Sequence, residues 1–423
     1  MTRPAGRTGA FRNRDFARFW TAITASGLGS QVTILAVPLV AVGELHASPT
    51  QLGILAALQG LPVLVVTPFA GVVADRYSSR SVNVLTDLGR GLLLLAVPAL
   101  AAADGLTIGW MYAIALAVGC LKSVADVAHH SILPSIVIKE ELVPANAAVN
   151  ASYSVSDIAG PGLGGLLIQA LTAPYAVIAD SLSFLLSGSL IASLPGSGPQ
   201  TGQPRGSWWS MAKEGFSYLF RERVLLTLSL AAGLANVFFQ FYSAVFILYA
   251  VQSLHFNSFV IGVTYGVGAV GGIAGAARSR RIGEKLGAVN AMLCGLAAVG
   301  AGMLAVAGAV EANATAVRVA VVTIGIFTFS AGLGIYNTHS VSTRQRIAKP
   351  ETLGRVTASA RLLSHGAGPI GSLAGGLIAA ATSPAVAVAA AGVGLMGMVI
   401  GLRWTPFARI PDHRAPERDL SAA

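Results

Sequence analysis

Long apolar runs dominate this sequence and constrain its fold more than any other feature. A helix needs about 20 mostly apolar residues to cross a bilayer, and helices satisfy their backbone hydrogen bonds internally, as lipid requires. Hydrophobic residues make up 54% of the 423 residues and charged residues 11%, whereas soluble domains carry about 25% charged residues. We therefore expect an all-α membrane protein with twelve transmembrane helices rather than a soluble enzyme. The predicted helices cover residues 19–42, 50–74, 82–103, 106–127, 146–171, 174–194, 224–250, 258–277, 287–309, 316–340, 356–381 and 384–404.

The positive charges fix the predicted orientation of these helices. If the amino terminus is cytosolic, all but four of the 28 Lys and Arg residues fall in cytosolic segments. The exceptions are Arg318, on the outer side, and Arg90, Lys122 and Arg361, which are embedded in predicted helices. The positive-inside rule describes this asymmetry. We expect both termini on the cytoplasmic side of a bacterial inner membrane, and we attribute the net charge of +10 to topology rather than to nucleic acid binding.

A repeat at half the chain length predicts two similar halves. Gly160-Pro161 recurs as Gly368-Pro369, 208 positions later. Transporters built from two parallel six-helix repeats hold their substrate near the midplane and rock one half against the other. A Pro-, Gly-, Ser- and Gln-rich interruption between the halves is typical of a flexible linker. The predicted parts are a six-helix bundle at 1–194, a cytoplasmic linker at 195–215, and a second bundle with a short cytoplasmic tail at 216–423.

The segment after the second predicted helix carries a family motif. Residues 71–80 read GVVADRYSSR and resemble the loop signature G-x-x-x-D-R-x-G-R-R/K of the major facilitator superfamily. The resemblance implies a cytoplasmic gating latch of Gly71, Asp75, Arg76 and Arg80. A carboxylate in such a latch accepts charge-assisted hydrogen bonds in one state and releases them in the other. A basic stop signal that only sets topology is the alternative.

Further segments resemble the drug:proton antiporters of this family, which include macrolide efflux proteins and enterobactin exporters. They are FRNRDF at 11–16, Leu133-Pro134 with ELVPAN at 141–146, and EGFSY at 214–218. The predicted helix 146–171 is similar to the family's antiporter signature through Gly160, Pro161, Gly164 and Gly165. Their spacing also suits close helix packing. The resemblance implies the major facilitator fold and export of a bulky hydrophobic or amphipathic small molecule, such as a drug, in exchange for protons.

Carboxylates inside the apolar runs are candidates for proton coupling. A charged group at the bilayer centre costs about 2.5–3.5 kcal/mol on insertion scales, so embedded acids are usually functional or paired. Asp157, near the middle of its helix, is the first candidate, followed by Asp180 and Asp126. The half-length offset maps Asp157 onto His365, and Arg361 lies four residues before His365. A structural pair of Asp157 with Arg361 is the alternative.

Two other embedded bases have an acid at helical spacing. Arg90 follows Asp87 by three residues and Asp126 follows Lys122 by four, which places each pair on one helix face. We expect Asp87 and Arg90 to neutralise each other. Asp126 either pairs with Lys122 or reaches Arg80 and joins the latch, and the spacing does not decide between these alternatives.

The substrate cavity implied by the resemblance lies between the halves, lined by the first, fourth, seventh and tenth helices. An apolar, aromatic wall with a few polar groups suits a bulky amphipathic ligand, and amides at mid-depth need hydrogen-bond partners. For the aromatic residues, contact with lipid is the alternative. The residues selected from these helices are Gln31, Asn236, Phe239, Gln240, Tyr242 and Asn337.

Motifs of other protein classes are not found in the sequence. The glycines lack the Gly-Lys-Ser/Thr ending of a phosphate-binding loop, so we expect an ion gradient, of protons or else sodium, as the energy source. His129 and His130 are adjacent and point apart on a helix, which does not make a metal site. We expect a monomer without cofactor, metal or enzymatic activity. An exporter of a siderophore, lipid or other secondary metabolite is one alternative, and a non-transporting membrane receptor or assembly factor is another.

Overall fold

Helices form the regular structure of this chain. The computed structural model describes residues 11, 13–66, 77–129, 132–195, 217–347 and 353–410, and no strand occurs among them. The described residues fall into two units. Unit 1 takes those within 1–47, 58–208 and 257–263, and unit 2 those within 48–57, 209–256 and 264–423.

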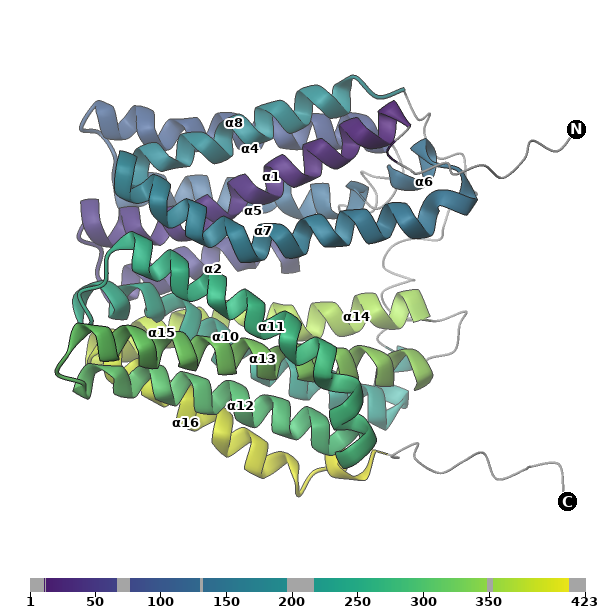
Figure 1. Ribbon diagram of the computed structural model, residues 1–423, viewed down its shortest axis with the longest axis vertical. Coiled ribbons are helices and arrows are strands. Elements are labelled where there is room, and N and C mark those ends of the chain that lie inside the picture. The colour runs from purple at the N-terminus through teal and green to yellow at the C-terminus, as the bar shows by residue number, and fades with distance from the viewer. Residues whose placement is uncertain are drawn as a thin grey trace, which may run out of the picture. The chain divides into compact units, whose positions relative to one another are not determined.

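In unit 1, α1 packs against both α7 and α8, and α4 packs against α5 and α8 (Figure 1). A π-helical turn at Val40–Glu44 follows α1, and a 3-10 turn at Lys139–Glu141 precedes α7. The helices of this unit are α1 (Arg14–Leu39), α4 (Ser79–Ala102), α5 (Ile108–His129), the short α6 (Leu133–Ile136), α7 (Leu142–Leu171) and α8 (Ala173–Ala192).

The start of α1 is fixed by its cap and by buried aromatic residues. The Asn13 side chain accepts hydrogen bonds from the backbone N–H groups of Asp15 and Phe16, which satisfies free donors of the first turn. Asn13 Nδ2 also donates to the Ile136 carbonyl oxygen over 2.7 Å. Phe16 and Phe19 are fully buried. These contacts set the direction in which α1 enters the bundle.

In unit 2, α10 packs against α14, α15 and α16, and α12 packs against α13 and α16 (Figure 1). Two helices contribute residues to both units: α2 (Pro49–Val65) belongs to unit 2 up to Ala57, and α11 belongs to unit 1 up to Val263. The helices of unit 2 are α10 (Arg223–Gln252), α11 (Ser258–Leu286), α12 (Ala288–Gly308), α13 (Thr315–Ile347), α14 (Leu353–Gly366), α15 (Gly368–Ala381) and α16 (Pro384–Leu402), with 3-10 turns at Ala309–Glu311 and Pro406–Arg409.

Nine helices within the described ranges are long and apolar enough to cross a membrane. Three predicted spans are not among them. The span 50–74 corresponds to the 17-residue apolar helix α2, and its last predicted residues lie outside the described part of the chain. The span 146–171 corresponds to α7. The span 356–381 is divided at Ala367 into α14 and α15, because Pro369 has no N–H for the carbonyl four residues earlier.

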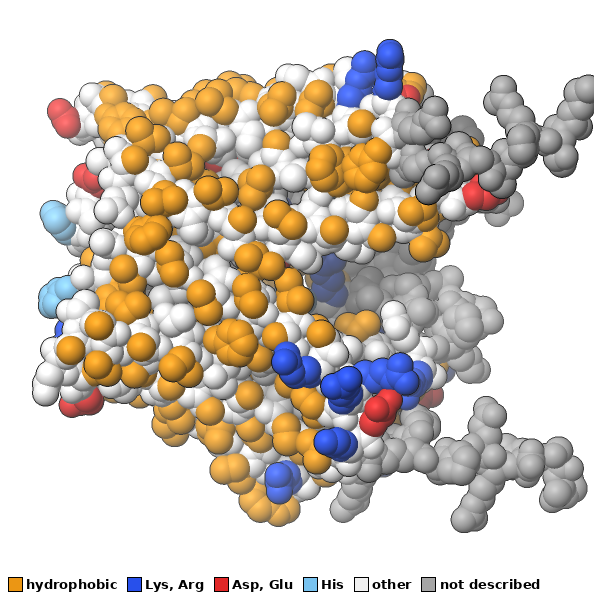
Figure 2. Space-filling model, in the orientation of Figure 1, with side chains coloured by type: hydrophobic (Ala, Val, Ile, Leu, Met, Phe, Trp, Pro, Cys, Tyr) orange, Lys and Arg blue, Asp and Glu red, His pale blue; other side chains and the backbone are white. Residues whose placement is uncertain are grey.

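Large apolar side chains cover the outside of each unit. On α4 of unit 1, Leu85 is 70% exposed and Leu92 64%; in unit 2, Ile324 on α13 is 65% exposed and Val393 on α16 is 61%. Figure 2 shows hydrophobic side chains along the helices, while the Lys and Arg side chains of unit 2 gather toward one end. Soluble proteins rarely expose apolar surfaces of this extent, so lipid is the solvent that fits this surface.

Candidate functional site

The first candidate site lies in unit 1, where α1 approaches α7. Gln31 on α1 donates a hydrogen bond from Nε2 to Oδ1 of Asp157 on α7, over 2.6 Å. Gly160, almost one turn further along α7, faces the same side chain, and a β-carbon there would lie 2.5 Å from Gln31 Cβ. Only glycine at position 160 leaves room for this approach. The structure thus brings together a predicted coupling acid and a predicted cavity residue.

The rest of the Gly-Pro motif shapes the surroundings of Asp157. Pro161 has no N–H, so the Asp157 carbonyl oxygen lacks its usual helical donor. Gly164 lies against the α1 backbone, where a β-carbon would meet Val32 Cα at 3.1 Å. Gly165 faces the backbone of Ser258 at the start of α11. The motif therefore packs α7 closely against two helices and frees a backbone acceptor next to the carboxylate.

Asp180, the second predicted acid, is buried on α8 with 1% exposure. Ser183 Oγ donates to the Asp180 carbonyl oxygen over 2.7 Å and lies 3.2 Å from Oδ1. Gly29 on α1 faces both side chains, and Arg90 lies within electrostatic range of the carboxyl group. Within the described residues, neither Asp180 nor Asp157 forms a salt bridge.

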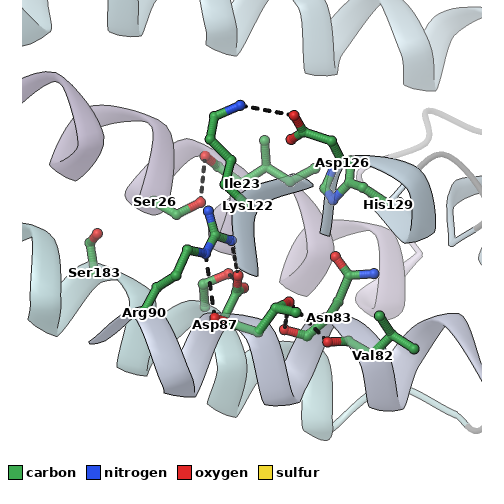
Figure 3. Close-up of polar contacts among 12 residues, drawn as sticks. Ile23, Ser26, Val82, Asn83, Asp87, Arg90, Lys122, Asp126, His129 and Ser183 are labelled. Carbon is green, nitrogen blue, oxygen red and sulfur yellow. Dashed lines mark hydrogen bonds and ion pairs between the residues drawn. The ribbon is translucent and has the colours of Figure 1, made fainter. Parts of the chain in front are cut away.

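The Asp87–Arg90 pair expected from the spacing is present and buried (Figure 3). Arg90 Nη2 donates to Asp87 Oδ1, and Ser187 Oγ on α8 donates to Asp87 Oδ2 over 2.7 Å. The Arg90 guanidinium also lies over the Phe184 ring, 4.1 Å from its centroid, in cation–π contact. This network links α4 to α8 and leaves neither charge uncompensated.

Asp126 takes the first of its two expected partners. Lys122 Nζ lies 2.8 Å from Asp126 Oδ2, and both side chains are largely exposed (Figure 3). Arg80 instead donates from Nη2 to the Ala192 carbonyl oxygen at the end of α8. An arginine there complements the negative end of the helix dipole. The other predicted latch residues, Gly71, Asp75 and Arg76, lie outside the described residues.

In unit 2, Gln240 has the same relation to the Gly-Pro motif as Gln31 in unit 1. A β-carbon at Gly368 on α15 would lie 3.1 Å from Gln240 Cγ and 3.2 Å from Asn236 Nδ2, both on α10. Asn236 Nδ2 donates to the Ser364 carbonyl oxygen over 3.0 Å. The half-length repeat is therefore visible in the positions of side chains as well as in the sequence.

His365 occupies the position in unit 2 that Asp157 occupies in unit 1. Its Nδ1 lies 3.2 Å from the Arg361 carbonyl oxygen on α14. Pro369 deprives the His365 carbonyl oxygen of its helical donor, as Pro161 does for Asp157. Each residue thus lies four positions before a proline that interrupts the helical hydrogen bonds, and unit 2 has a histidine where unit 1 has an aspartate. Pairing of Arg361 with Asp157 would join residues of two units and stays a hypothesis.

A pocket of about 210 Å³ lies inside unit 2. Residues of α10, α12, α13, α14 and α16 line it. Its polar side chains are Asn236, Tyr336, Asn337, Ser364 and His365, and its apolar side chains include Phe239, Leu296, Val299 and Leu395. Three of the predicted cavity residues, Asn236, Phe239 and Asn337, therefore share one pocket.

Tyr242, another predicted cavity residue, is not among the residues that line this pocket. It is buried with 5% exposure and stacks on Phe246 and Phe329, with ring centroids 5.4 Å and 5.5 Å away. Phe329 also stacks on Phe239, 5.6 Å away. Tyr242 thus belongs to an aromatic stack that extends from the pocket wall.

Sequence reasoning missed two groups of polar residues. On α1, Trp20 Nε1 donates to the Ala148 carbonyl oxygen and Thr24 Oγ1 donates to Ser152 Oγ on α7, over 3.3 Å and 3.0 Å. In unit 2, Ser364 lines the pocket. A stripe at positions 20, 24 and 31 could have indicated the first group, but only if the packing of α1 on α7 were known.

Comparisons with known proteins agree with this geometry. Residues 19–372 match the family model described as Major Facilitator Superfamily. The chain belongs to the major facilitator superfamily. Solved structures of this fold include the nucleoside transporter NupG, with a TM-score of 0.71, 11% identity and coverage of 94% of this chain and 99% of NupG. A bacterial homologue of the iron transporter ferroportin gives a TM-score of 0.68 at 17% identity, covering 91% of this chain and 98% of that one.

Curated relatives match shorter stretches of this chain. The uncharacterized MFS-type transporter YfiS of Bacillus subtilis is 29% identical over 209 residues, which are 48% of this chain and 49% of YfiS. The multidrug efflux pump Tap of Mycobacterium tuberculosis is 30% identical over 50% of this chain and 52% of Tap. The enterobactin exporter EntS of Citrobacter koseri is 26% identical over 66% of this chain and 64% of EntS.

The matched region spans about half the length of YfiS and of Tap. Family and fold together make this chain a multi-pass membrane protein of the major facilitator superfamily.

Proposed function

We propose that this protein exports a bulky hydrophobic or amphipathic small molecule by alternating access, in exchange for protons. It works as a monomer in the bacterial inner membrane with both termini in the cytoplasm. The efflux pump and the exporter among its relatives support outward transport. The positive-inside distribution of Lys and Arg supports the orientation.

The hydrogen bond between Gln31 and Asp157 carries the proposal of proton coupling. A carboxyl group in the middle of a membrane helix is costly unless it has a function or a charged partner. Its partner here is a neutral amide, which offers both a donor and an acceptor. Gln31 can therefore donate to the carboxylate and, after its amide turns, accept from the protonated acid. The same contact serves both states of a proton carrier.

Asp87 and Asp126 are less suitable proton carriers, because each already faces a base on its own helix. A fixed positive charge favours the ionised carboxylate. Asp180 remains the second candidate, since it is buried and forms no salt bridge with any described residue. Substitution distinguishes Asp157 from Asp180.

The test is drug-induced proton release in inverted membrane vesicles that carry an imposed pH gradient. Quinacrine quenching reports the gradient, and hydrophobic antibiotics and dyes are added one at a time. Wild type should dissipate the gradient with some of these compounds, Asp157→Asn with none, and Asp157→Glu in part. If Asp180→Asn alone fails to dissipate the gradient, the coupling acid is Asp180 on α8 and not Asp157. A full response in both asparagine variants would reject proton coupling through either acid.

Export of a siderophore is the second candidate function, supported by the match to an enterobactin exporter over 66% of this chain. It predicts that iron-starved cells lacking this protein retain catecholate siderophore and that the cloned gene restores secretion. Unchanged siderophore in the medium would reject it. Drug susceptibility of the same deletion strain tests the first proposal in parallel.

A further inference from the structure

We propose that the pocket inside unit 2 selects ligands by charge, accepting a neutral or anionic aromatic group and rejecting a cationic one. This inference names the chemistry of the ligand that the pocket binds. Only the statement that this ligand is then exported rests on the proposed function. Four observations carry it: the size of the pocket, its apolar wall, its hydrogen-bond donors and the charges around it.

The size of the pocket sets what part of a ligand it holds. Pockets for drug-sized ligands measure about 300–1,000 Å³, and this one measures about 210 Å³. It therefore takes one ring system of a larger molecule. Phe239, Leu296 and Leu395 offer that ring an apolar wall, and the stack of Phe239 on Phe329 holds the aromatic face in place.

The polar side of the pocket offers hydrogen-bond donors to a ligand. Tyr336 is 4% exposed, and its hydroxyl has no hydrogen-bond partner among the described residues. A buried hydroxyl without a hydrogen bond is unfavourable, so a ligand that accepts from it gains a contact that water cannot easily supply. Asn236 uses one amide hydrogen on Ser364 and keeps a second. A ligand oxygen, as in a carboxylate, phenolate or carbonyl, would meet these donors.

The charges around the pocket have one sign. No carboxylate occurs among its described lining residues, and the positive charges near it are those of arginines around the lining residue His365. Arg361 and Arg344 both lie within electrostatic range of His365. The acids of the sequence between residues 216 and 411 are Glu222, Glu284, Glu311 and Glu351, and none falls within a predicted membrane helix.

The predicted membrane helices of unit 1, by contrast, carry acids as well as the bases Arg90 and Lys122. The acids are Asp87, Asp126, Asp157 and Asp180. In a low-dielectric site a uniform positive field attracts anions and repels cations strongly, and rejection by like charge is a common source of specificity. The acid proposed for proton coupling and the pocket proposed for the ligand thus lie in different units.

The experiment measures binding of three probes that share one bicyclic ring and differ in charge: 2-naphthoate, 2-naphthamide and 2-naphthylmethylammonium. Purified full-length protein in neutral detergent micelles is dialysed to equilibrium against each probe, and uptake by empty micelles is subtracted. We expect the carboxylate to bind at least about tenfold tighter than the ammonium, with the amide between them.

Variants assign this preference to the pocket. Arg361→Gln should reduce the ratio between carboxylate and ammonium, and Tyr336→Phe should weaken both oxygen-bearing probes. Arg318→Gln is the matched control, because Arg318 donates to the Ala312 carbonyl oxygen at the start of α13 and does not line the pocket. Each variant is compared only if it elutes as a single species of wild-type size.

Two results would overturn the inference. One is an ammonium probe that binds as tightly as the carboxylate. The other is a ratio of carboxylate to ammonium affinity that stays at the wild-type value in Arg361→Gln. Dialysis needs no gradient, so a protein that binds these probes as expected but does not transport them would contradict the proposed function and leave the charge selectivity intact.

Discussion

Gly160→Ala tests the contact between α1 and α7 most sharply. The added β-carbon would lie 2.5 Å from Gln31 Cβ and 2.6 Å from Gln31 Cγ. Carbon atoms in good contact lie about 3.5–4.0 Å apart, so Gln31 or the α1 backbone must shift by about 1 Å. Such overpacking costs about 1–3 kcal/mol. The shift also removes the hydrogen bond that positions Asp157.

Gly162→Ala is the matched control, two residues away on the same helix. Nothing lies within 4 Å of a β-carbon at position 162. Alanine is favoured over glycine in a helix by about 1 kcal/mol, and this gain is common to both variants. The unfolding free energies of the two variants should therefore differ by the overpacking cost alone, about 1–3 kcal/mol.

Unfolding in SDS, followed by circular dichroism in mixed micelles, measures this difference, and vesicle transport measures its functional consequence. Gly160→Ala should be the less stable variant and should lose proton-coupled export, while Gly162→Ala should retain both. Equal stability and equal transport in the two variants would refute the assignment of Gly160 as the residue that admits Gln31.

Three further predictions follow from other contacts. Arg90→Met should destabilise the protein by about 3–5 kcal/mol, because it leaves the buried Asp87 carboxylate without its base. Adding Asp87→Asn should restore part of this stability in SDS unfolding. Additive losses of stability in the double variant would contradict an interaction between Asp87 and Arg90. Gln240→Ala should alter which compounds are exported, since Gln240 lies beside Gly368 as Gln31 lies beside Gly160. If the same set of compounds inhibits transport in the variant and in wild type, Gln240 does not contact the ligand. Asp75→Asn should favour the inward-open state, and cysteine accessibility that stays the same on both membrane faces would exclude a latch.

The sequence predicted the membrane class, the family and the pairs within one helix, because these depend on composition, local motifs and helical spacing. Asp87 with Arg90 is an example, since i,i+3 neighbours share a helix face in any fold. Lys122 with Asp126 was one of two alternatives that the spacing left open, and the structure decided between them. The break at Ala367 was missed, although Gly368-Pro369 was noted as a motif, because proline within a membrane helix is compatible with either a kink or a break.

Contacts between helices could not be predicted in the same way. Gln31 and Asp157 were selected separately, and their hydrogen bond depends on how α1 packs on α7 and on the register between the two helices. Tyr242 was assigned to a cavity wall because of the helix on which it lies. Its ring instead stacks on Phe246 and Phe329, and the sequence does not show this contact. The pocket required the positions of five helices, which no spacing within one segment contains.

The central claim is that Asp157 gives up a proton as a ligand binds, and proton release in unbuffered detergent solution measures this directly. The pH-sensitive dye pyranine reports protons freed when 2-naphthamide, which has no titrating group of its own near neutral pH, is added to purified full-length protein. Wild type should release protons in proportion to the probe bound, and Asp157→Asn should bind the same probe and release none. Equal release from the two proteins would contradict the account.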